Sequence, residues 1–226
     1  MKSLISYIVA FIIGLILFIG LALLGWGLRH LPQFFDNPAR SAYVIVILLL
    51  QLFAVAYNPQ TGRHRGQEKS GITNNKIDLI LIQLFSLSIV FLAPFSDNRS
   101  IVILNFGDGI RYLGLVLIVL GFLLMQIAEK YLDKQFSVEV AIQEDHQLIQ
   151  TGPYAFVRHP RYLGIVTFFL GISLVFQSFL AIILVAGLFL VLIWRAYAEE
   201  ALLKKEFGKQ WDAYCEKSWR MIPFVF

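Results

Sequence analysis

The sequence has little charge and almost no cysteine. Asp, Glu, Lys and Arg make up 15% of its 226 residues, whereas a soluble domain of this size carries roughly a quarter. Hydrophobic residues make up 58% of the chain, and so much apolar surface excludes an ordinary water-soluble domain. Cys215 is the single cysteine, which excludes an intramolecular disulfide and a fold that depends on an oxidising compartment.

Signatures of several protein classes are also missing. No G-x-G-x-x-G follows a strand-like segment, so a Rossmann cofactor crevice is not indicated. No repeat with a period of 20–50 residues and no nucleic-acid-binding module can be recognised. No metal-ligand spacing is present, because no cysteine lies near the four histidines and these are dispersed along the chain: His30, His64, His146 and His159.

The chain contains instead a series of long apolar runs. A bilayer core about 30 Å thick needs roughly 20 helical residues to cross it. Four runs predict such helices: Ser3–Leu28, Ser41–Tyr57, Ile77–Phe95 and Ile110–Ala128. The first is longer than the apolar region of a secretory signal and lacks a clear cleavage site, which favours an uncleaved helix.

The last apolar run has an unusual length. Leu163–Trp194 holds 32 residues without a charge; as one helix it would be about 48 Å long, and as two full spans it is too short. Gln177-Ser178 is the only adjacent polar pair in the run. We favour a tight helical hairpin with two short arms that turns there, and one long tilted helix is the alternative.

The distribution of cations predicts the orientation in the membrane. All but four of the 19 Lys and Arg residues fall on the face that receives the N-terminus, the 58–76 loop, the 131–161 segment and the C-terminal tail. The four exceptions are Arg29, Arg40, Arg99 and Arg111. The positive-inside rule then places the first face in the cytoplasm. We therefore expect an all-α polytopic integral membrane protein with four transmembrane helices, a short C-terminal helical hairpin and a cytoplasmic C-terminal helix.

Polar residues gather in two places on that face. The first is His146–Gly164, where Gly152-Pro153 forces a turn and His159-Pro160 prevents a regular helix before the hairpin begins. Irregular backbone at the membrane boundary is tolerated where it lines a polar cavity, so backbone groups here are candidate ligand contacts. Taken singly, His159 is equally well an interfacial histidine, and the nearby tyrosines an aromatic belt.

The second place follows the hairpin. Arg195 and Glu199 are four residues apart and share a helix face, next to Glu200. This pattern fits a carboxylate clamp beside a cation site, or a snorkelling arginine with a surface salt bridge. The helix is expected to continue to Gly208, which suits a C-terminal cap.

These segments together resemble a known family. The stretches SVEVAIQEDHQLIQTGPYAFVRHPRYLG and RAYAEEALLKKEFGKQWDAYCEKSWRMIP combine His, Gly-Pro-Tyr, Arg-His-Pro-x-Tyr-x-Gly, Arg-x-x-x-Glu-Glu, Phe-Gly and Arg-x-x-Pro in one order. Over Tyr131–Pro223 the chain resembles the isoprenylcysteine carboxyl methyltransferase family and its bacterial relatives. The resemblance divides the chain into N-terminal transmembrane helices 1–3 at residues 1–109 and a catalytic region at residues 110–226.

The resemblance implies S-adenosylmethionine as methyl donor, bound on the cytoplasmic side of the bacterial inner membrane or its equivalent. The cofactor contacts carried over are His146, Gln147, Leu148, Ile149, Tyr154, His159, Pro160, Arg161, Tyr162 and Glu199. Arg195 corresponds to a substrate-binding arginine, and Gln143 corresponds loosely to a family glutamine because the spacing differs. The implied partners are a lipophilic or lipidated substrate and membrane lipids; no nucleic acid or obligate protein partner is indicated.

The chemistry of such a reaction suits these residues. Methyl transfer from a sulfonium is an in-line displacement that depends mostly on alignment. A carboxylate acceptor is already ionised at pH 7 and needs no general base, and a guanidinium such as Arg195 binds it bidentately. An amine or phenol acceptor requires a base, for which Glu199 or Glu200 is the candidate. Arg195, Glu199 and Glu200 are therefore the expected catalytic residues.

Two other classes of function stay open. The tail FGKQWDAYCEKSWRMIPFVF also resembles the end of the sterol reductases, which predicts a membrane oxidoreductase that uses NADPH. A non-catalytic membrane scaffold would bind no cofactor. Binding of S-adenosylhomocysteine or of NADPH separates these possibilities.

Overall fold

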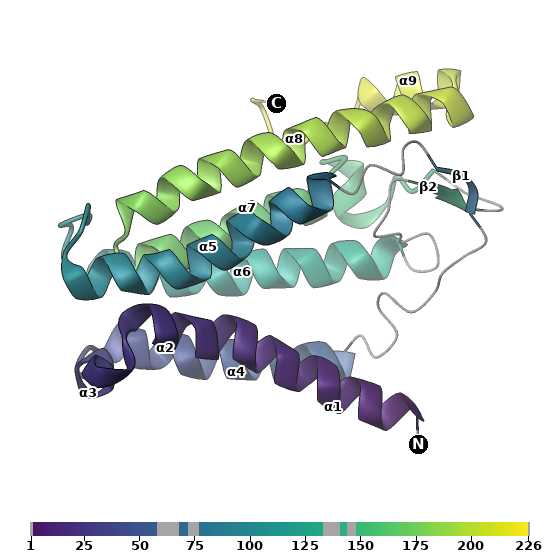
Figure 1. The fold of residues 1–226 in the computed structure, drawn as a ribbon. Helices are drawn as coiled ribbons and strands as arrows, with labels where there is room; N and C mark the ends of the chain where they lie inside the picture. Colours follow the sequence, from purple (N-terminus) through teal and green to yellow (C-terminus); the bar gives the residue numbers. More distant parts are fainter. Residues whose placement is uncertain (1, 58–67, 72–76, 133–140, 144–147, 226) are drawn as a thin grey trace.

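The computed structural model describes residues 2–57, 68–71, 77–132, 141–143 and 148–225. Five helical segments are long and apolar enough to cross a membrane (Figure 1). The first combines α1 (Lys2–Leu15), a π-helical turn at Ile16–Gly20 and α2 (Leu21–Trp26). The others are α4 (Pro38–Tyr57), α5 (Ile77–Arg99), α6 (Gly109–Leu132) and α8 (Phe179–Phe207). The prediction of an all-α polytopic membrane protein is confirmed; the expected number of spans stays a prediction.

Shorter elements connect these helices. They are a 3-10 turn at Leu28–His30, α3 (Leu31–Phe35), β1 (Glu68–Gly71), β2 (Ala141–Gln143), a 3-10 turn at Gly152–Ala155, α7 (Pro160–Val175) and α9 (Lys209–Cys215). β1 and β2 pair antiparallel, with Gly71 opposite Ala141. Apart from these two short strands, the regular structure of the described residues is helical.

One predicted helix end is wrong. We expected the third span to end at Phe95, beside Pro94, but α5 runs through the proline to Arg99. A proline inside a helix removes one backbone donor and crowds the preceding turn, but polar contacts hold the extra turn here. The Asp97 carboxylate accepts two hydrogen bonds from Arg111, at 2.7 and 2.8 Å.

The predicted hairpin is confirmed, and its turn lies where the polar pair predicts it. Helix α7 ends at Val175 and α8 begins at Phe179. Gln177 has a φ of 48°, and its Nε2 donates to the Gly107 carbonyl at 2.6 Å. The hydroxyl of Ser178 caps α8 by accepting from the Ala181 amide at 3.1 Å. Two polar side chains thus supply contacts of a turn that contains neither glycine nor proline.

The prediction of two short arms is wrong for one of them. α7 has 16 residues and is too short for a candidate span, whereas α8 has 29 and is long enough. The apolar run ends at Trp194, but helical backbone continues over polar residues to Phe207, and Gly208 with a φ of 51° ends it. The expected glycine cap is therefore confirmed, and the site residues of α8 lie beyond its apolar part.

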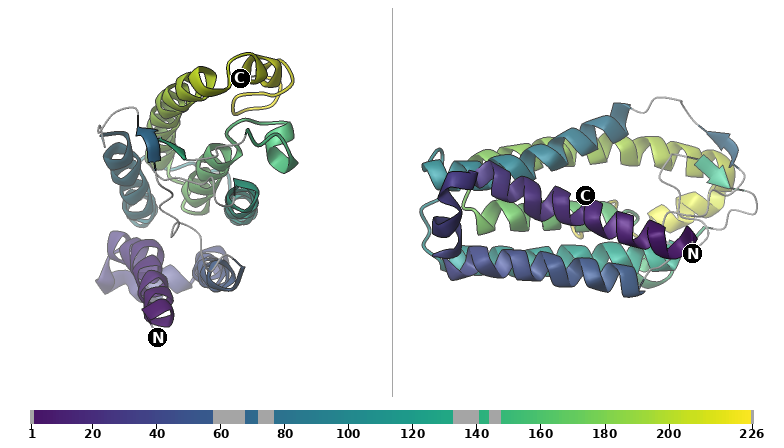
Figure 2. Two further views of the ribbon diagram at one scale, coloured as in Figure 1. Left: turned by 90° about the vertical axis from the view of Figure 1, so that its right-hand side faces the viewer. Right: turned by 60° about the horizontal axis from the view of Figure 1, so that its bottom comes forward.

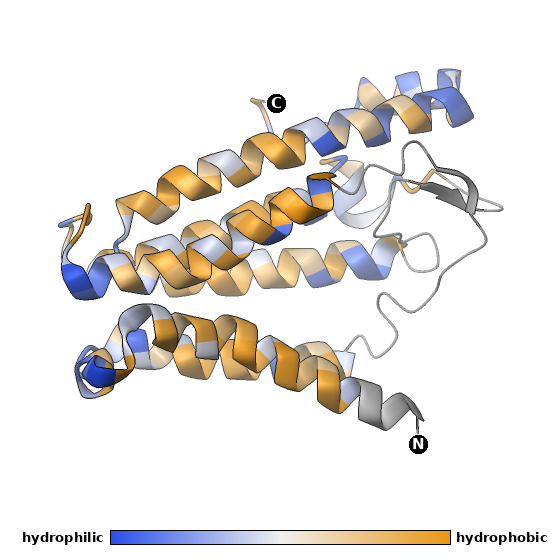
Figure 3. Ribbon diagram, in the orientation of Figure 1, coloured by the Kyte–Doolittle hydropathy of each residue, from blue (hydrophilic) through white to orange (hydrophobic). Residues whose placement is uncertain are grey.

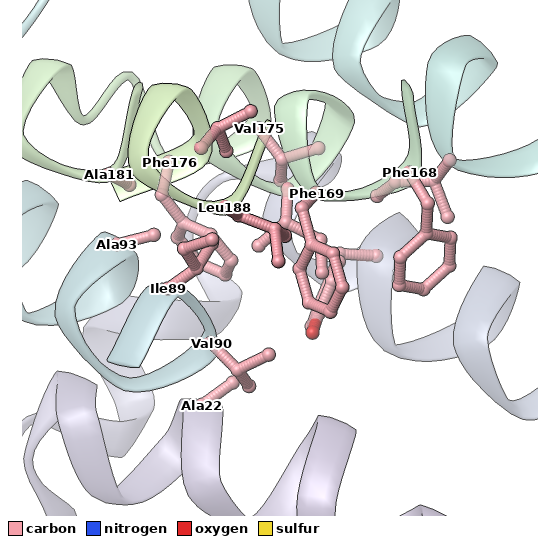
Figure 4. Packing of buried hydrophobic residues seen from close by; sticks show 14 of the residues in the cluster. Ala22, Ile89, Val90, Ala93, Phe168, Phe169, Val175, Phe176, Ala181 and Leu188 are labelled. Carbon is pink, nitrogen blue, oxygen red and sulfur yellow. The ribbon is translucent and has the colours of Figure 1, made fainter. Parts of the chain in front are cut away.

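The helices form two groups. Figures 1 and 2 show α1, α2 and α4 together on one side of the molecule and α5, α6, α7 and α8 on the other. Contacts of α2 with α5 and of α4 with α6 join the groups. Buried side chains from both fill the interface, among them Ala22, Ile89, Phe169, Phe176 and Leu188 (Figure 4).

Glycines allow α6 and α7 to pack closely. A Cβ atom on Gly114 would lie 2.6 Å from the carbonyl oxygen of Gly171, and one on Gly121 would lie 2.7 Å from that of Gly164. Each helix thus carries two glycines seven residues apart, and these face the two glycines of the other helix. Such close backbone approach is typical of membrane helix pairs.

Polar residues concentrate at the two ends of the bundle, and the middle is apolar (Figure 3). One end carries α3 and the α7–α8 turn; the other carries the short strands, the start of α7 and α9 (Figure 1). The candidate residues of α7 and α8 lie at this second end.

Candidate active site

Arg195 lies at the centre of a polar network at the second end of the bundle. Its side chain is 5% exposed. Its Nε donates to the Tyr162 hydroxyl at 2.8 Å and to Oε1 of Glu199 at 3.1 Å. Its Nη1 donates to the carboxylate of Asp78, in the first turn of α5. Arg195 therefore connects α5, α7 and α8.

His159 and Tyr162 form one wall of the network. His159 precedes the first turn of α7, where Pro160 stands at the helix start, a position that suits proline because the first helical N–H needs no partner. The two rings stack with centroids 5.3 Å apart and planes within 1°. The Tyr162 hydroxyl donates to Glu199, and Nδ1 of His159 lies 3.5 Å from the same carboxylate.

The protonation of His159 is set by two opposing effects. Burial acts to lower its pKa, but hydrogen bonds from the ring to Glu199 and Glu200 favour the charged form more strongly, and the pKa lies above its ordinary value. The ring nitrogen Nε2 lies 3.2 Å from Oε1 of Glu200. The imidazolium is thus the form that both carboxylates stabilise.

Glu200 is held by two further cations. Its Oε1 accepts from Arg158 at 3.0 Å, and its Oε2 accepts from Arg220 at 2.9 Å. The Arg220 guanidinium also lies 4.1 Å from the centroid of the Tyr197 ring. With both carboxylate oxygens occupied, Glu200 joins α8 to the start of α7 and to the C-terminal tail.

The tail pairs with the segment before α7 through its backbone. The amide of Arg158 donates to the carbonyl of Trp219 at 2.8 Å, and that of His159 donates to Arg220 at 3.0 Å. The Trp219 amide donates to the carbonyl of Phe156 at 2.9 Å. These bonds join the Arg-His-Pro segment to the Arg-x-x-Pro segment, and each supplies hydrogen-bond partners for irregular backbone of the other.

The Gly-Pro-Tyr motif forms the short 3-10 turn between β2 and α7. The Tyr154 hydroxyl donates to the Ala128 carbonyl of α6 at 3.4 Å, and the Tyr154 carbonyl accepts from the Tyr214 hydroxyl at 2.6 Å. Burial raises the pKa of Tyr214 to about 12, so this hydroxyl is a stable donor. Gly152, with a φ of 61°, lies against the Tyr131 ring, where a Cβ would be 2.3 Å from a ring carbon.

The structure brings together five of the predicted site residues in direct contact: His159, Tyr162, Arg195, Glu199 and Glu200. Arg161 directly precedes Tyr162 in the first turn of α7 and donates to Glu129 of α6 at 2.9 Å. Leu148 and Ile149 precede the Gly-Pro-Tyr turn and are half-buried. His146 and Gln147 lie outside the described residues, and Gln143 pairs with Glu68 through its backbone in β2.

Three members of the network were not predicted as site residues from the sequence: Asp78, Arg158 and Arg220. Asp78 lies within the predicted third span, and an ionisable residue at the end of an apolar helix is a recognised sign of a functional position. The two arginines lie inside the recognised motifs, but their spacing from Glu200 gives no sign that all three meet.

The C-terminal half of the chain matches known methyltransferases. Residues 110–210 match the family model described as phospholipid methyltransferase. The chain is 25% identical over 123 residues to a probable protein-S-isoprenylcysteine O-methyltransferase of Oryza sativa subsp. indica. The predicted resemblance to the isoprenylcysteine carboxyl methyltransferase family is confirmed. The alignment covers 51% of this chain and 62% of the rice protein, so the chain spans about three fifths of the length of that relative.

Two other comparisons cover different parts of the chain. A solved structure of a eukaryotic intramembrane Ras methyltransferase, isoprenylcysteine carboxyl methyltransferase, is similar with a TM-score of 0.49 and 19% identity, over 96% of this chain and 98% of that one. The 7-dehydrocholesterol reductase of Arabidopsis thaliana is 33% identical over 82 residues, which cover 35% of this chain and 19% of the reductase. The reductase similarity is therefore shorter than the methyltransferase similarity.

Proposed function

We propose that this protein is an S-adenosylmethionine-dependent membrane methyltransferase that O-methylates the carboxylate of a lipophilic substrate, as its isoprenylcysteine relatives are named to do. The observation that carries the proposal is the Arg195–Tyr162–Glu199–His159 network at one end of a bundle of apolar helices. It joins a buried guanidinium to a carboxylate in the region that matches the methyltransferases.

The residues present fit the donor. Its sulfonium and ammonium are positive, and Glu199, whose side chain is 24% exposed, supplies a carboxylate for one of them. The amino-acid end of the donor carries one positive and one negative charge. The Arg161–Glu129 pair offers the complementary charges, and its Arg161 side chain is 33% exposed. When bound, the donor supplies an electrophilic methyl group. The proposed donor contacts are Leu148, Ile149, Tyr154, His159, Pro160, Arg161, Tyr162 and Glu199, with His146 and Gln147 carried over from the family.

Arg195 binds the acceptor in this proposal. A carboxylate is ionised at neutral pH and attacks the methyl carbon without a general base, so the protein has to align the two reactants and exclude water. Arg195 provides the cation, and Tyr162 and Glu199 fix the orientation of its guanidinium. Glu200 holds the loop and tail in place, because its two oxygens are already bonded to His159, Arg158 and Arg220.

The site faces the cytoplasm in this proposal, and the protein lies in a bacterial inner membrane or its equivalent. Among the described residues, cations lie at the end of α6, the start of α7 and the end of α8, all at the site end, and the positive-inside rule places such an end in the cytoplasm. A soluble donor then enters from the aqueous side, while the apolar chain of the acceptor stays in the bilayer.

Transfer of a labelled methyl group tests the proposal. Purified protein in detergent is given methyl-labelled S-adenosylmethionine with either an N-acetylated isoprenylcysteine or its primary amide. We expect an alkali-labile methyl ester from the acid and no label on the amide. Label on the amide, or on neither compound, would contradict a carboxyl methyltransferase.

A second candidate is an NADPH-dependent reductase related to the sterol reductases, which the similarity of 82 residues to 7-dehydrocholesterol reductase favours. A thermal-shift measurement separates the two. We expect S-adenosylhomocysteine to raise the unfolding temperature and NADPH to leave it unchanged; the reverse result would favour the reductase.

A further inference from the structure

Asp78 is a member of the Arg195 network from a different part of the chain. It lies in the first turn of α5, 117 residues before Arg195, and its side chain is 15% exposed. α5 and α8 pack side by side (Figure 1). The Asp78 carboxylate bonds to Nη1 of Arg195, so a residue from outside the methyltransferase match contacts the residue proposed to bind the acceptor.

The charges around Arg195 are unfavourable for another anion. Nε of the guanidinium donates to Glu199, and Nη1 donates to Asp78, so two carboxylates already share one cation. A third carboxylate at the same guanidinium would add repulsion between like charges where burial limits screening. An acceptor carboxylate therefore binds well only if one of the two present carboxylates leaves.

Asp78 is the more easily released of the two. Glu199 is held by Arg195, by Tyr162 and by His159. Within the described part of the chain, Arg195 is the partner found for the Asp78 carboxylate. A released Asp78 also keeps a favourable position, because the N-terminus of a helix stabilises a negative charge in its first turn.

We propose that Asp78 occupies the position on Arg195 that the acceptor carboxylate takes, and that acceptor binding displaces it. Asp78 then tunes the affinity of the site for its acceptor. It keeps the buried guanidinium paired in the absence of acceptor, and it lowers the affinity for every carboxylate acceptor by competing with it. This inference rests on the proposed function, since it assigns the acceptor carboxylate to Arg195.

The substitution Asp78→Asn tests the competition. Asparagine keeps the size of the side chain and an oxygen acceptor for Arg195 but removes the negative charge. We expect the N-acetylated isoprenylcysteine acid to bind about fivefold to tenfold more tightly, measured calorimetrically with S-adenosylhomocysteine present. KM for the acid should fall by a similar factor, and kcat should change less than about twofold. The primary amide of the probe should bind equally to both proteins.

Two further variants serve as controls. Asp212→Asn removes one negative charge from an exposed pair with Lys204 in the tail, and it should leave the affinity for the acid unchanged. Asp78→Glu retains the charge and should keep the affinity within about twofold of the wild type. If Asp78→Asn does not elute as a folded protein, Asp78→Ser carries the same expectation with a smaller neutral side chain.

Weaker binding of the acid to Asp78→Asn would overturn the proposal, because Asp78 would then support Arg195 and not compete for it. Equal changes for the acid and the amide would also overturn it. Failure of the proposed function gives a different result: the wild type itself would then transfer no methyl group to the acid.

Discussion

The hydroxyl of Tyr162 accepts a hydrogen bond from Nε of Arg195 at 2.8 Å and donates one to Glu199. A single oxygen on α7 thus fixes both the cation and the carboxylate that α8 presents one turn apart. Because Tyr162 follows the His159-Pro160 start of α7, the position of that helix start determines how the two α8 side chains are oriented.

Removal of this hydroxyl should impair catalysis more than folding. In Tyr162→Phe the ring still stacks on His159, but Arg195 and Glu199 lose a shared partner. We expect kcat/KM for methyl transfer to fall about 10- to 100-fold, with a stability loss of about 1–2 kcal/mol. Tyr112→Phe, at a half-exposed position on α6, is the matched control; an equal loss in both variants would contradict the role of Tyr162.

Substitution of Glu199 should weaken binding of the methyl donor, whereas substitution of Arg195 should impair use of the acceptor. Glu199→Ala is expected to weaken binding of S-adenosylmethionine at least about tenfold, because it removes the carboxylate proposed to face the donor's positive charge. Arg195→Ala should impair use of the acceptor more than binding of the donor. Calorimetric titration gives the affinity of each variant for each ligand. Arg99→Ala is the control, because the Arg99 guanidinium lies over the Phe95 ring at the opposite end of the bundle. The same loss for both ligands in both variants would refute the division of roles.

Glu200 should matter for stability. Glu200→Gln leaves the cations of Arg158 and Arg220 without the carboxylate that joins them. Breaking a buried ion pair from one side costs about 3–5 kcal/mol, and the remaining exposure of Arg220 should reduce this to about 2–3 kcal/mol. Thermal unfolding in detergent measures this loss of stability. The control is Glu216→Gln, which changes an exposed glutamate in the tail. Unchanged unfolding of Glu200→Gln would mean that the tail is held by other contacts.

The contribution of His159 should depend on pH. Its pKa is raised in the folded protein by Glu199 and Glu200 against the effect of burial, so the folded state binds the proton more tightly than the unfolded state. The stabilisation is complete below the ordinary histidine pKa of about 6.5 and is lost as pH rises through the higher folded pKa.

We therefore expect the difference in unfolding temperature between the wild type and His159→Gln to be largest near pH 6 and to shrink towards pH 9. His30→Gln, at the opposite end of the bundle, is the matched control for loss of a histidine. A wild-type advantage that grows with pH would show that His159 is neutral in the fold.

The glycine contacts between α6 and α7 should be intolerant of any side chain. In Gly171→Ala the new Cβ would lie 2.6 Å from the Gly114 carbonyl oxygen and 2.7 Å from the Ile118 amide nitrogen. Backbone atoms cannot move aside without separating the helices, so we expect a loss of about 2–4 kcal/mol. Gly109→Ala, with open space around the new atom, should be neutral or slightly stabilising. Equal unfolding temperatures for the two variants would contradict close packing of α6 on α7.

The division into residues 1–109 and 110–226 stays a prediction. The Asp78–Arg195 bond shows why sequence reasoning alone does not decide it, since the network draws a side chain from each segment. The resemblance indicated His159, Tyr162, Arg195 and Glu199, because they lie within the two segments that carry it. It could not indicate Asp78, which lies outside those segments.

The resemblance to a known family indicated the candidate site residues. Composition and local spacing determined that this protein has apolar helices, where they lie, and that the last run turns at Gln177-Ser178. These properties follow from hydropathy and from periodicity within one segment, which are local. Only the tertiary structure decided that α8 is long, that Glu200 joins Arg158 to Arg220, and that Asp78 bonds to Arg195. Each of these depends on how helices far apart in the sequence pack, and local patterns carry no information on that packing.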